Sequence, residues 1–291
     1  MTASPRIAGT AIKICFQSGT INRALNPPTS YSSKKPSPFS YPFPILFKDL
    51  FRMKRILLTC LTLLILPVNA SAHGIWITER FGNQAIVYGH GASDDYYDFE
   101  KISEAHSLDQ EGTKSPVTIK KTAAHATLKP LKNTAVLIAT FDNGYWSKTK
   151  DGKWHNTAKS ETPGAVFTGH YSKFTTSILD KTVAAFTPSG MKLEIVPLIN
   201  PLTLHQGESL PIQVYYNEKP AEGLKVIGEY TTDGETTSGT TDGQGKATVT
   251  IRNQGLNVIA VSHTSSIDNN PELDEEGYFS TLSFSLDHSH D

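Results

Sequence analysis

Sulfur is scarce in this sequence of 291 residues. Both of its cysteines, Cys15 and Cys60, and two of its three methionines precede residue 73, which leaves Met191 as the one later sulfur. Residues 73–291 therefore have no disulfide, no thiolate-rich metal site and no methionine-lined copper(I) site. All ten histidines lie in this part of the chain, so nitrogen and oxygen donors remain for a metal ion.

Long apolar runs and catalytic motifs are also missing after residue 72. No stretch there approaches the ~20 apolar residues of a membrane span. The sequence has no G-x-S-x-G nucleophile motif, no H-E-x-x-H zinc motif and no glycine-rich phosphate loop. We therefore expect a protein that is not an enzyme and that has no membrane span once a leader is removed.

Basic residues are few once the first 72 residues are set aside. Nine of the 27 lysines and arginines and one of the 28 acidic residues lie there, which leaves 18 basic and 27 acidic residues and a formal charge of −9. An acidic surface argues against nucleic acid and anionic membranes as partners and is compatible with attracting cations. Acidity alone can also serve only to keep an exported protein soluble.

Residues 53–72, MKRILLTCLTLLILPVNASA, have the pattern of a secretory signal peptide. The basic pair Lys54-Arg55 precedes an apolar run over residues 56–66, and Ala70-Ser71-Ala72 is a small-residue cleavage site. Cleavage there would make His73 the first residue of an exported protein. We expect this protein in the bacterial periplasm.

Residues 1–52 do not have the composition of a folded segment. Residues 26–44, NPPTSYSSKKPSPFSYPFP, are dense in proline and serine and have no helical or strand period, so the segment is predicted to be disordered. Two interpretations remain: a mis-assigned upstream extension, since a signal peptide works at an amino terminus, or an unusually long leader.

An amino-terminal histidine has a chemistry that an internal histidine lacks. Its α-amine and its ring Nδ1 can close a six-membered chelate on one metal ion. Reference pKa values are roughly 6.5 for an imidazole and 7.7 to 8.0 for an α-amine, so such a site binds better above neutral pH than in acid. The alternative is that cleavage merely happens to precede His73.

The first half, residues 73–190, is predicted to be a β-sandwich. Alternating residues indicate strands at 75–77 and 85–87 with a turn at Phe81-Gly82-Asn83, and a further turn is predicted at Asp142-Asn143-Gly144. Counted from Gly82, His73 lies nine residues back and His90 eight residues forward. An antiparallel hairpin would therefore bring these two rings together.

The second half, residues 191–291, is predicted to be an immunoglobulin-like β-sandwich. Turn signals recur every 8 to 12 residues between short strands such as LPIQVYY, KATVTI and LNVIAVSH. The fold class that follows is all-β, with two β-sandwich domains divided near residue 190.

His170 and His263 are further candidate metal ligands. His170 follows a glycine and precedes an aromatic segment, and His263 ends a strand near the acidic loop PELDEEG. For both, a packed or surface role is the alternative. Trp146 and Trp154 are expected on either side of a hairpin turn, where they either contact a ligand or fill a core.

Several motifs together resemble a known family. The mature start HGIW, the strand end VYGHG, and the stretches FDNGYWSKTKDGKWHN, GHYSKF, LEIVPLINPLTLHQGESLPIQVYYNEKP and YFSTLSFSL are similar to an exported family of unknown function that is associated with the periplasmic component of cobalt and nickel uptake systems. The resemblance spans about residues 73–287. It implies two β-sandwich modules, Ni²⁺ or Co²⁺ as the metal, His73 and His90 as ligands, and a membrane importer as the partner.

The sequence therefore supports one main hypothesis and two alternatives. The main hypothesis is a periplasmic metal-binding accessory component of a nickel or cobalt uptake system. Cu²⁺ is a third candidate ion, since it binds nitrogen ligands more tightly than either. The alternatives are a surface module that binds carbohydrate or protein and a copper oxidase that uses the same chelate.

Overall fold

The computed structural model describes residues 73–123 and 125–286. Its regular elements in these ranges are β-strands and three short 3₁₀ turns, η1 (Phe99–Lys101), η2 (Lys159–Glu161) and η3 (Pro201–Thr203), which confirms the all-β class. None of the described helices is long and apolar enough to cross a membrane. The predicted signal peptide (53–72) and the predicted extension (1–52) lie outside the described residues.

Four strands form the first sheet, which is antiparallel. Their order is β1 (Gly74–Arg80), β2 (Asn83–Gly89), β6 (Ala126–Lys129) and β5 (Thr118–Lys121). β1 and β2 are the predicted hairpin, and the two turn residues, Phe81 and Gly82, both have positive φ, as a two-residue type I′ turn requires. Gly74 pairs with Gly89, so the next pair outward is His73 and His90.

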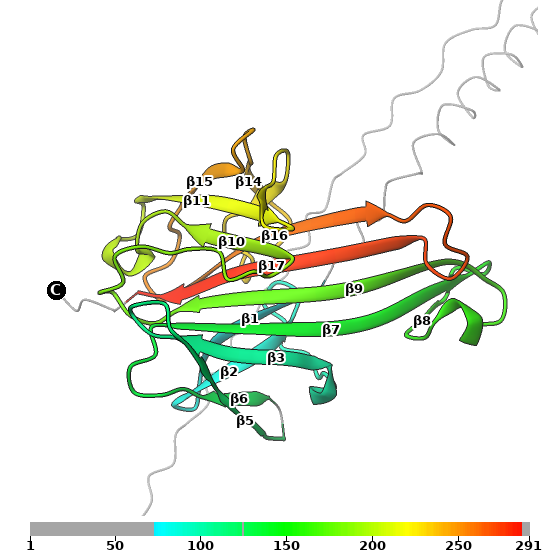
Figure 1. Ribbon diagram of the computed structural model, residues 1–291, viewed down its shortest axis with the longest axis horizontal. Helices are drawn as coiled ribbons and strands as arrows, with labels where there is room; N and C mark the ends of the chain where they lie inside the picture. Colours follow the sequence, from blue (N-terminus) through cyan, green and yellow to red (C-terminus); the bar gives the residue numbers. More distant parts are fainter. Residues whose placement is uncertain (1–72, 124, 287–291) are drawn as a thin grey trace, which may run out of the picture. The chain divides into compact units, whose positions relative to one another are not determined.

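Nine strands form the second sheet, which runs through the middle of the fold (Figure 1). Their order is β14 (Thr237–Thr240), β13 (Lys225–Ile227), β16 (Leu256–Ser266), β17 (Glu275–Ser285), β9 (Ala165–Ile178), β7 (Val136–Thr149), β3 (Ile102–Leu108) and β4 (Lys114–Pro116), with β8 (Trp154–His155) paired to β7. β17 pairs with β9 in parallel, whereas the other neighbours are antiparallel.

A third sheet covers one face of the nine-stranded sheet, and the β1–β2 hairpin lies against the other (Figure 1). The third sheet contains β10 (Leu193–Pro197), β11 (Ser209–Tyr216), β12 (Lys219–Pro220) and β15 (Lys246–Thr250). The largest core lies between this sheet and the nine-stranded sheet and includes Ile195, Ile212, Ile259 and Leu282. The long apolar side chains of both sheets are withdrawn from water there.

Two smaller cores fix the β1–β2 hairpin. Ile75 and Ile77 pack with Phe141 and other side chains on one side of the hairpin, and Trp76 packs with Tyr230 and other side chains on the opposite side. Both faces of β1 are therefore buried. A strand of this kind reads as a continuous apolar run, and GIWI at the start of β1 follows that rule.

The free edge of β1 is closed by side chains of the nine-stranded sheet. The Thr281 and Ser283 hydroxyls donate to the carbonyls of Ile75 and Ile77 at 2.6 and 2.7 Å, and Lys173 Nζ donates to the carbonyl of His73. These are alternate carbonyls, the ones that β2 cannot reach. An edge strand with unpaired backbone groups is a site for unwanted pairing, and this contact removes it.

The domain boundary predicted near residue 190 lies between β9 and β10. The nine-stranded sheet contains strands from both sides of this boundary, because β17 pairs with β9 over ten residues. The described residues belong to one compact unit. The immunoglobulin-like character of residues 191–291 stays a prediction.

The turn predicted at Asp142-Asn143-Gly144 is wrong. β7 continues through these residues, and its pairing with β9 shifts register between Asp142 and Gly144. Gly144 has a φ of +77°, and its N–H donates to Asp142 Oδ1 at 2.9 Å. The aspartate and glycine that suggested a chain reversal therefore form a β-bulge, for which the same residue types are suited.

Candidate functional site

His73 and His90 lie side by side at the open end of the β1–β2 hairpin. Their ring centroids are 6.5 Å apart and the rings are tilted by 58°. The equal arms of the hairpin produce this arrangement, as the count of residues on either side of Gly82 predicted. Both residues are partly exposed, so an ion from solvent can reach them.

The His73 ring is held in one orientation. Its Nε2 lies 3.0 Å from Asp95 Oδ2, and the ring stacks on Tyr88 at 5.1 Å with an interplanar angle of 17°. Ser93 donates to the same carboxylate oxygen of Asp95 at 2.8 Å. Asp95 thus engages Nε2 and not Nδ1, and Nδ1, which is the ring nitrogen nearer the backbone, is the one that can chelate together with an α-amine.

The His90 ring is held by residues from the second half of the chain. Its Nε2 lies 2.9 Å from Glu235 Oε1, and its Nδ1 lies 3.4 Å from the Tyr230 hydroxyl. The buried Tyr230 also donates to the carbonyl of Gly89 at 3.0 Å and meets the His90 ring edge-on. Burial raises the pKa of Tyr230 above its usual range, so its hydroxyl keeps its proton at neutral pH.

Sequence reasoning missed Asp95, Tyr230 and Glu235. Asp95 stands in the acidic stretch SDDYYDFE, where nothing distinguishes it from its neighbours. Tyr230 and Glu235 are about 140 residues from His90 along the chain, in the connection between β13 and β14. No local pattern links residues so far apart.

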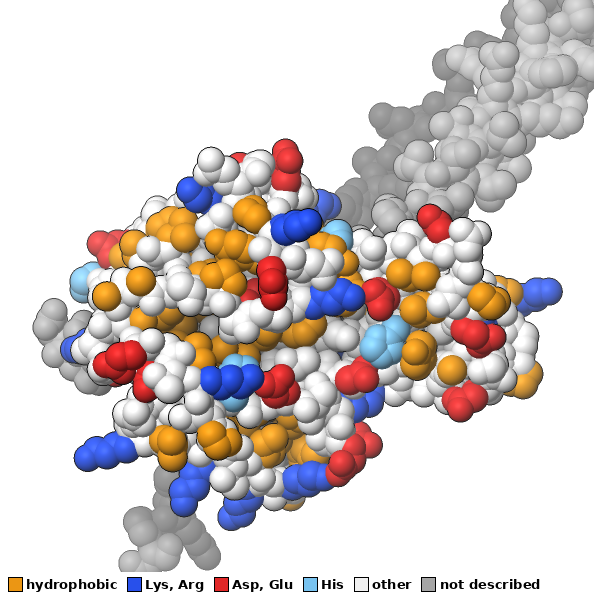
Figure 2. Space-filling view, in the orientation of Figure 1, with side chains coloured by type: hydrophobic (Ala, Val, Ile, Leu, Met, Phe, Trp, Pro, Cys, Tyr) orange, Lys and Arg blue, Asp and Glu red, His pale blue; other side chains and the backbone are white. Residues whose placement is uncertain are grey.

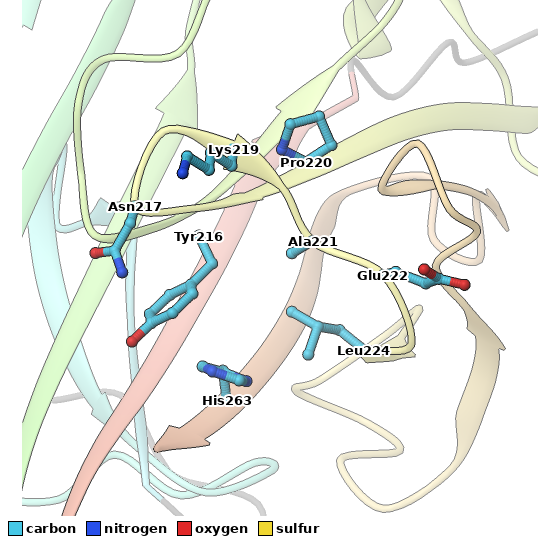
Figure 3. A pocket seen from close by; sticks show the side chains of 8 residues that line it. All are labelled: Tyr216, Asn217, Lys219, Pro220, Ala221, Glu222, Leu224 and His263. Carbon is cyan, nitrogen blue, oxygen red and sulfur yellow. The ribbon is translucent and has the colours of Figure 1, made fainter. Parts of the chain in front are cut away.

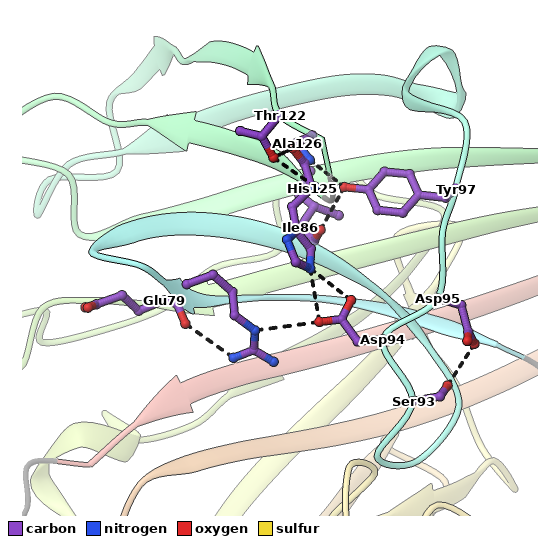
Figure 4. A network of polar contacts seen from close by, with 10 residues as sticks. Glu79, Ile86, Ser93, Asp94, Asp95, Tyr97, Thr122, His125 and Ala126 are labelled. Carbon is purple, nitrogen blue, oxygen red and sulfur yellow. Dashed lines mark hydrogen bonds and ion pairs between the residues drawn. The ribbon is translucent and has the colours of Figure 1, made fainter.

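The loop that carries Asp95 is tied to the first sheet (Figure 4). Asp94 accepts from His125 Nε2 at 2.9 and 3.0 Å and lies 3.8 Å from Arg80 Nε. The buried Tyr97 donates to the carbonyl of Ile86 at 2.7 Å and accepts from the N–H of residue 126 at 2.9 Å. Asp95 thus lies between two anchored residues, and its carboxylate is positioned before any ligand arrives.

Lys173 lies beneath the site. It is 4% exposed, its Nζ donates to the carbonyl of His73, and the rings of Tyr88 and Phe279 lie 5.8 and 5.9 Å from it. Burial, with a smaller contribution from the charge of Lys101, lowers the pKa of Lys173 to about 7. Burial therefore disfavours the protonated form of this lysine at neutral pH.

This buried lysine should make stability depend on pH. The unfolded chain has the ordinary lysine pKa of 10.5, so between about pH 7 and 10.5 it holds a proton that the folded state has lost. The free energy of unfolding therefore rises with pH in this window, by at most about 1.4 kcal/mol per unit, and below pH 7 the destabilisation is present in full. Urea denaturation of metal-free residues 73–291 at pH 7, 8 and 9 measures the slope.

The matched variant for this measurement is Lys173→Met. It keeps the length of the side chain and removes the proton, while the loss of the bond to the His73 carbonyl adds an offset that does not vary with pH. The free energy of unfolding of the unchanged protein, minus that of the variant, should therefore rise with pH. Parallel pH curves would contradict a lowered pKa of Lys173.

His170 and His263 lie away from the pair at the hairpin. Phe174 and Ile178, at alternate positions from His170 along β9, point into the core under the third sheet. His263 pairs with Tyr278 of the same core. Both histidines are therefore on the face of the nine-stranded sheet opposite β1, and neither can share an ion with His73.

The surroundings of these two histidines also differ from those of the pair. His170 Nε2 lies 3.0 Å from Asp142, and the His170 ring lies 4.7 Å from that of Tyr145. His263 lies 4.3 Å from the ring of Tyr216. Burial lowers the pKa of His263, so this imidazole is neutral at pH 7.

The donor set at the hairpin is near the geometry of a divalent-ion site but is incomplete. The 6.5 Å between ring centroids is longer than the roughly 5 Å that two imidazoles span when both bind the same ion at about 2.0–2.1 Å in a tetrahedral site, so the rings must move slightly closer to share an ion. Across residues 73–123 and 125–286, no group of three or more His, Cys, Asp or Glu side chains is arranged to hold a metal. The third donor of the predicted site is the α-amine of His73, which exists only after the bond between Ala72 and His73 is cut.

The fold and this site together define the class of the protein. It is an all-β protein of three sheets, in which a hairpin at the start of the described chain presents two histidines, each paired with a carboxylate. The chain belongs to the family described as a domain of unknown function, DUF4198, whose profile matches residues 70–265. That range contains His73, His90, Asp95, Tyr230 and Glu235.

Comparison with individual proteins adds one relative. An uncharacterized protein of Haemophilus influenzae is 28% identical over 159 residues, which cover 54% of this chain and 67% of that protein. No solved structure matches the chain.

Proposed function

We propose that the protein is a non-enzymatic periplasmic component of a nickel or cobalt uptake system. Its mature chain binds the divalent cation through the α-amine and Nδ1 of His73 together with the His90 ring. It then passes the ion to a membrane importer. The metal is cargo in this proposal and takes part in no reaction.

The single observation that carries the proposal is the contact between Asp95 and Nε2 of His73 at 3.0 Å. Histidines that bind metals commonly present the other ring nitrogen to a carboxylate, which fixes the orientation of the ring and makes the ligand nitrogen more basic. Here the nitrogen engaged by the carboxylate is the one that an amino-terminal chelate does not use. His90 has the same kind of partner in Glu235, at 2.9 Å.

The choice of metal rests on the resemblance of motifs, whereas the site rests on the geometry of the hairpin. Nitrogen donors suit Ni²⁺ and Co²⁺, but intrinsic affinity favours Cu²⁺ over both. The resemblance of motifs such as HGIW and VYGHG to an uptake-associated family is what favours nickel and cobalt. Selectivity against copper then comes from geometry, from the supply of ions or from the importer.

The experiment is a calorimetric titration with NiCl₂ and CoCl₂ of residues 73–291, beginning at His73. A second version carries one extra alanine ahead of His73, which turns the amine into an amide and moves the free amine away. We expect the first version to bind one ion per chain and the second to bind at least about tenfold more weakly, because it has lost a donor.

Two outcomes would overturn the proposal. Equal affinity in the two versions would show that the amino-terminal chelate does not bind the ion. Absence of binding in both would show that the protein does not bind these metals. A double variant, His170→Ala with His263→Ala, is the control. Both residues lie on the far face of the nine-stranded sheet, so the variant should bind the ion as the unchanged protein does.

A further inference from the structure

A half-open cavity of about 340 Å³ lies on the face of the nine-stranded sheet opposite His73 and His90 (Figure 3). Tyr216 at the end of β11 and His263 near the end of β16 form one wall, and Leu224 faces them. Asn217, Lys219 and Glu222 also line the cavity, and Figure 3 shows the Glu222 side chain pointing away from Tyr216 and His263. A cavity of this size, largely apolar with a few polar groups, is typical of a small-molecule site.

The two rings of the cavity wall belong to a cluster of three aromatic rings. The rings of Tyr216 and His263 are 4.3 Å apart, and His263 lies nearly parallel to Tyr278, at 12° and 6.5 Å. Tyr216 and Tyr278 are 5.5 Å apart. The rings therefore support one another, and the neutral imidazole of His263 leaves the wall without a charge.

The rim of the cavity is held by a tight turn. Tyr216 pairs with Lys219, and the two residues between them, Asn217 and Glu218, have φ of 49° and 62°. This is the geometry of a two-residue hairpin turn with positive φ at both positions. The Asn217 amide is thus presented at the opening by a fixed backbone.

A second aromatic pair lies on the same face of the sheet. Tyr145 on β7 and His170 on β9 are 4.7 Å apart, and Asp142 lies 3.0 Å from His170. β16 and β7 are separated by β17 and β9, so His263 and Tyr145 are about 14 Å apart across the strands. Figure 2 shows histidine, acidic and hydrophobic side chains over this part of β7, β9 and β17, beyond the ends of β10 and β11.

Between the two pairs the face carries groups of both charges. Lys192 lies over the ring of Tyr278 at 4.8 Å and contacts Glu276 at 3.2 Å. Tyr278 in turn donates to Glu276. The charges are therefore paired with each other. The surface from the cavity to Tyr145, here called the strip, presents rings, hydroxyls and hydrogen-bonding groups without a strong net charge.

We propose that this face binds an uncharged oligosaccharide, with one sugar ring in the cavity against Tyr216 and His263 and another sugar ring against Tyr145. A pyranose has an apolar face of C–H groups and a rim of hydroxyls. The C–H face suits an aromatic wall, and the hydroxyl rim suits the Asn217 amide and the Lys219 ammonium that line the cavity. A purely apolar ligand would leave these two polar groups without partners.

This site is separate from the histidine pair and independent of the proposed metal function. It also differs from the carbohydrate site expected from the sequence, which used tryptophans. Trp146 lies beside Lys101 and donates to the carbonyl of Asn143, and Trp154 packs on Phe167. The ring platforms of the strip are instead tyrosines and histidines.

The test is a calorimetric and NMR titration of residues 73–291, with EDTA present, using cellohexaose, chitohexaose and maltohexaose and the disaccharide of each. We expect at least one hexasaccharide to bind in the micromolar to millimolar range. Tyr216→Ala should weaken binding about tenfold or more. Tyr145→Ala should weaken the hexasaccharide and leave the corresponding disaccharide unchanged, because only the longer chain reaches Tyr145.

Controls separate binding from folding. Tyr96→Ala removes a 77% exposed ring outside the strip and should change nothing. Lys219→Ala removes an exposed donor that lines the cavity and should weaken binding severalfold even if Tyr216→Ala fails to fold. Absence of binding by all three hexasaccharides overturns the proposal, as does binding that neither Tyr216→Ala nor Lys219→Ala weakens. EDTA excludes any contribution from a bound ion, so the result does not depend on the metal proposal.

Discussion

Asp95→Asn should lower the affinity of the mature protein for Ni²⁺ or Co²⁺ by about 10- to 100-fold. The amide keeps the size of the side chain and can still accept from Ser93, but it removes the negative charge 3.0 Å from Nε2 of His73. Without that charge the ring is less basic and less firmly oriented, and losses of this size follow when such a partner is removed from a metal-binding histidine. Calorimetric titration of mature protein and variant side by side measures the change.

The chain offers a matched control for this substitution. Asp142 forms the same kind of contact with His170, also at 3.0 Å, but on the opposite face of the nine-stranded sheet. Asp142→Asn should leave metal affinity unchanged. If the two variants bind metal equally well, Asp95 has no role in ligation and His73 is not held for a chelate. Thermal denaturation of both checks that neither effect comes from a loss of folding.

Local patterns predicted the hairpin but not the sheet that supports it. Alternation on both sides of Phe81-Gly82-Asn83 gave β1 and β2 with the observed pairing, because strand and turn are decided within about 17 residues. The parallel pairing of β17 with β9 joins segments about a hundred residues apart. Local sequence patterns do not show which distant segments pair. The restart of the strand pattern near residue 190 therefore predicted a division there, although the nine-stranded sheet contains strands from both sides of it.

The same limit applied to the candidate site. The position of His73 behind a cleavage motif and its distance from Gly82 were visible in the sequence. The carboxylates were not, since Asp95 is one of several acids in its loop and Glu235 lies in the connection before β14. His170 was predicted from the glycine before it and the aromatic segment after it, and His263 from the nearby acidic loop PELDEEG. The alternation of β9 and β16 placed them on the other face, where they meet tyrosines rather than a second pair of donors.

Gly89→Ala should abolish high-affinity metal binding and destabilise the protein. Gly89 is the last residue of β2, and the loop after it turns back so closely that an added Cβ would lie 2.2 Å from the carbonyl oxygen of Ser93. The backbone must move to relieve this overlap, at a cost of about 1–3 kcal/mol, as is common when a packed site is overfilled. The bond from the N–H of His90 to Ser93, at 2.7 Å, and the one from Ser93 to Asp95 lie directly in the path of that movement.

Gly91→Ala is the control for this last substitution. A Cβ at Gly91 meets nothing within 4 Å, although its φ of +58° imposes a strain that alanine tolerates less well than glycine. It should therefore cost some stability, as Gly89→Ala does, yet keep metal affinity within severalfold of the unchanged protein. Urea denaturation and metal titration of both variants separate the two effects. Equal loss of affinity in both would mean that general stability governs binding, whereas loss in Gly89→Ala alone identifies the turn that carries Ser93 and Asp95 as the part that positions the His73 ring.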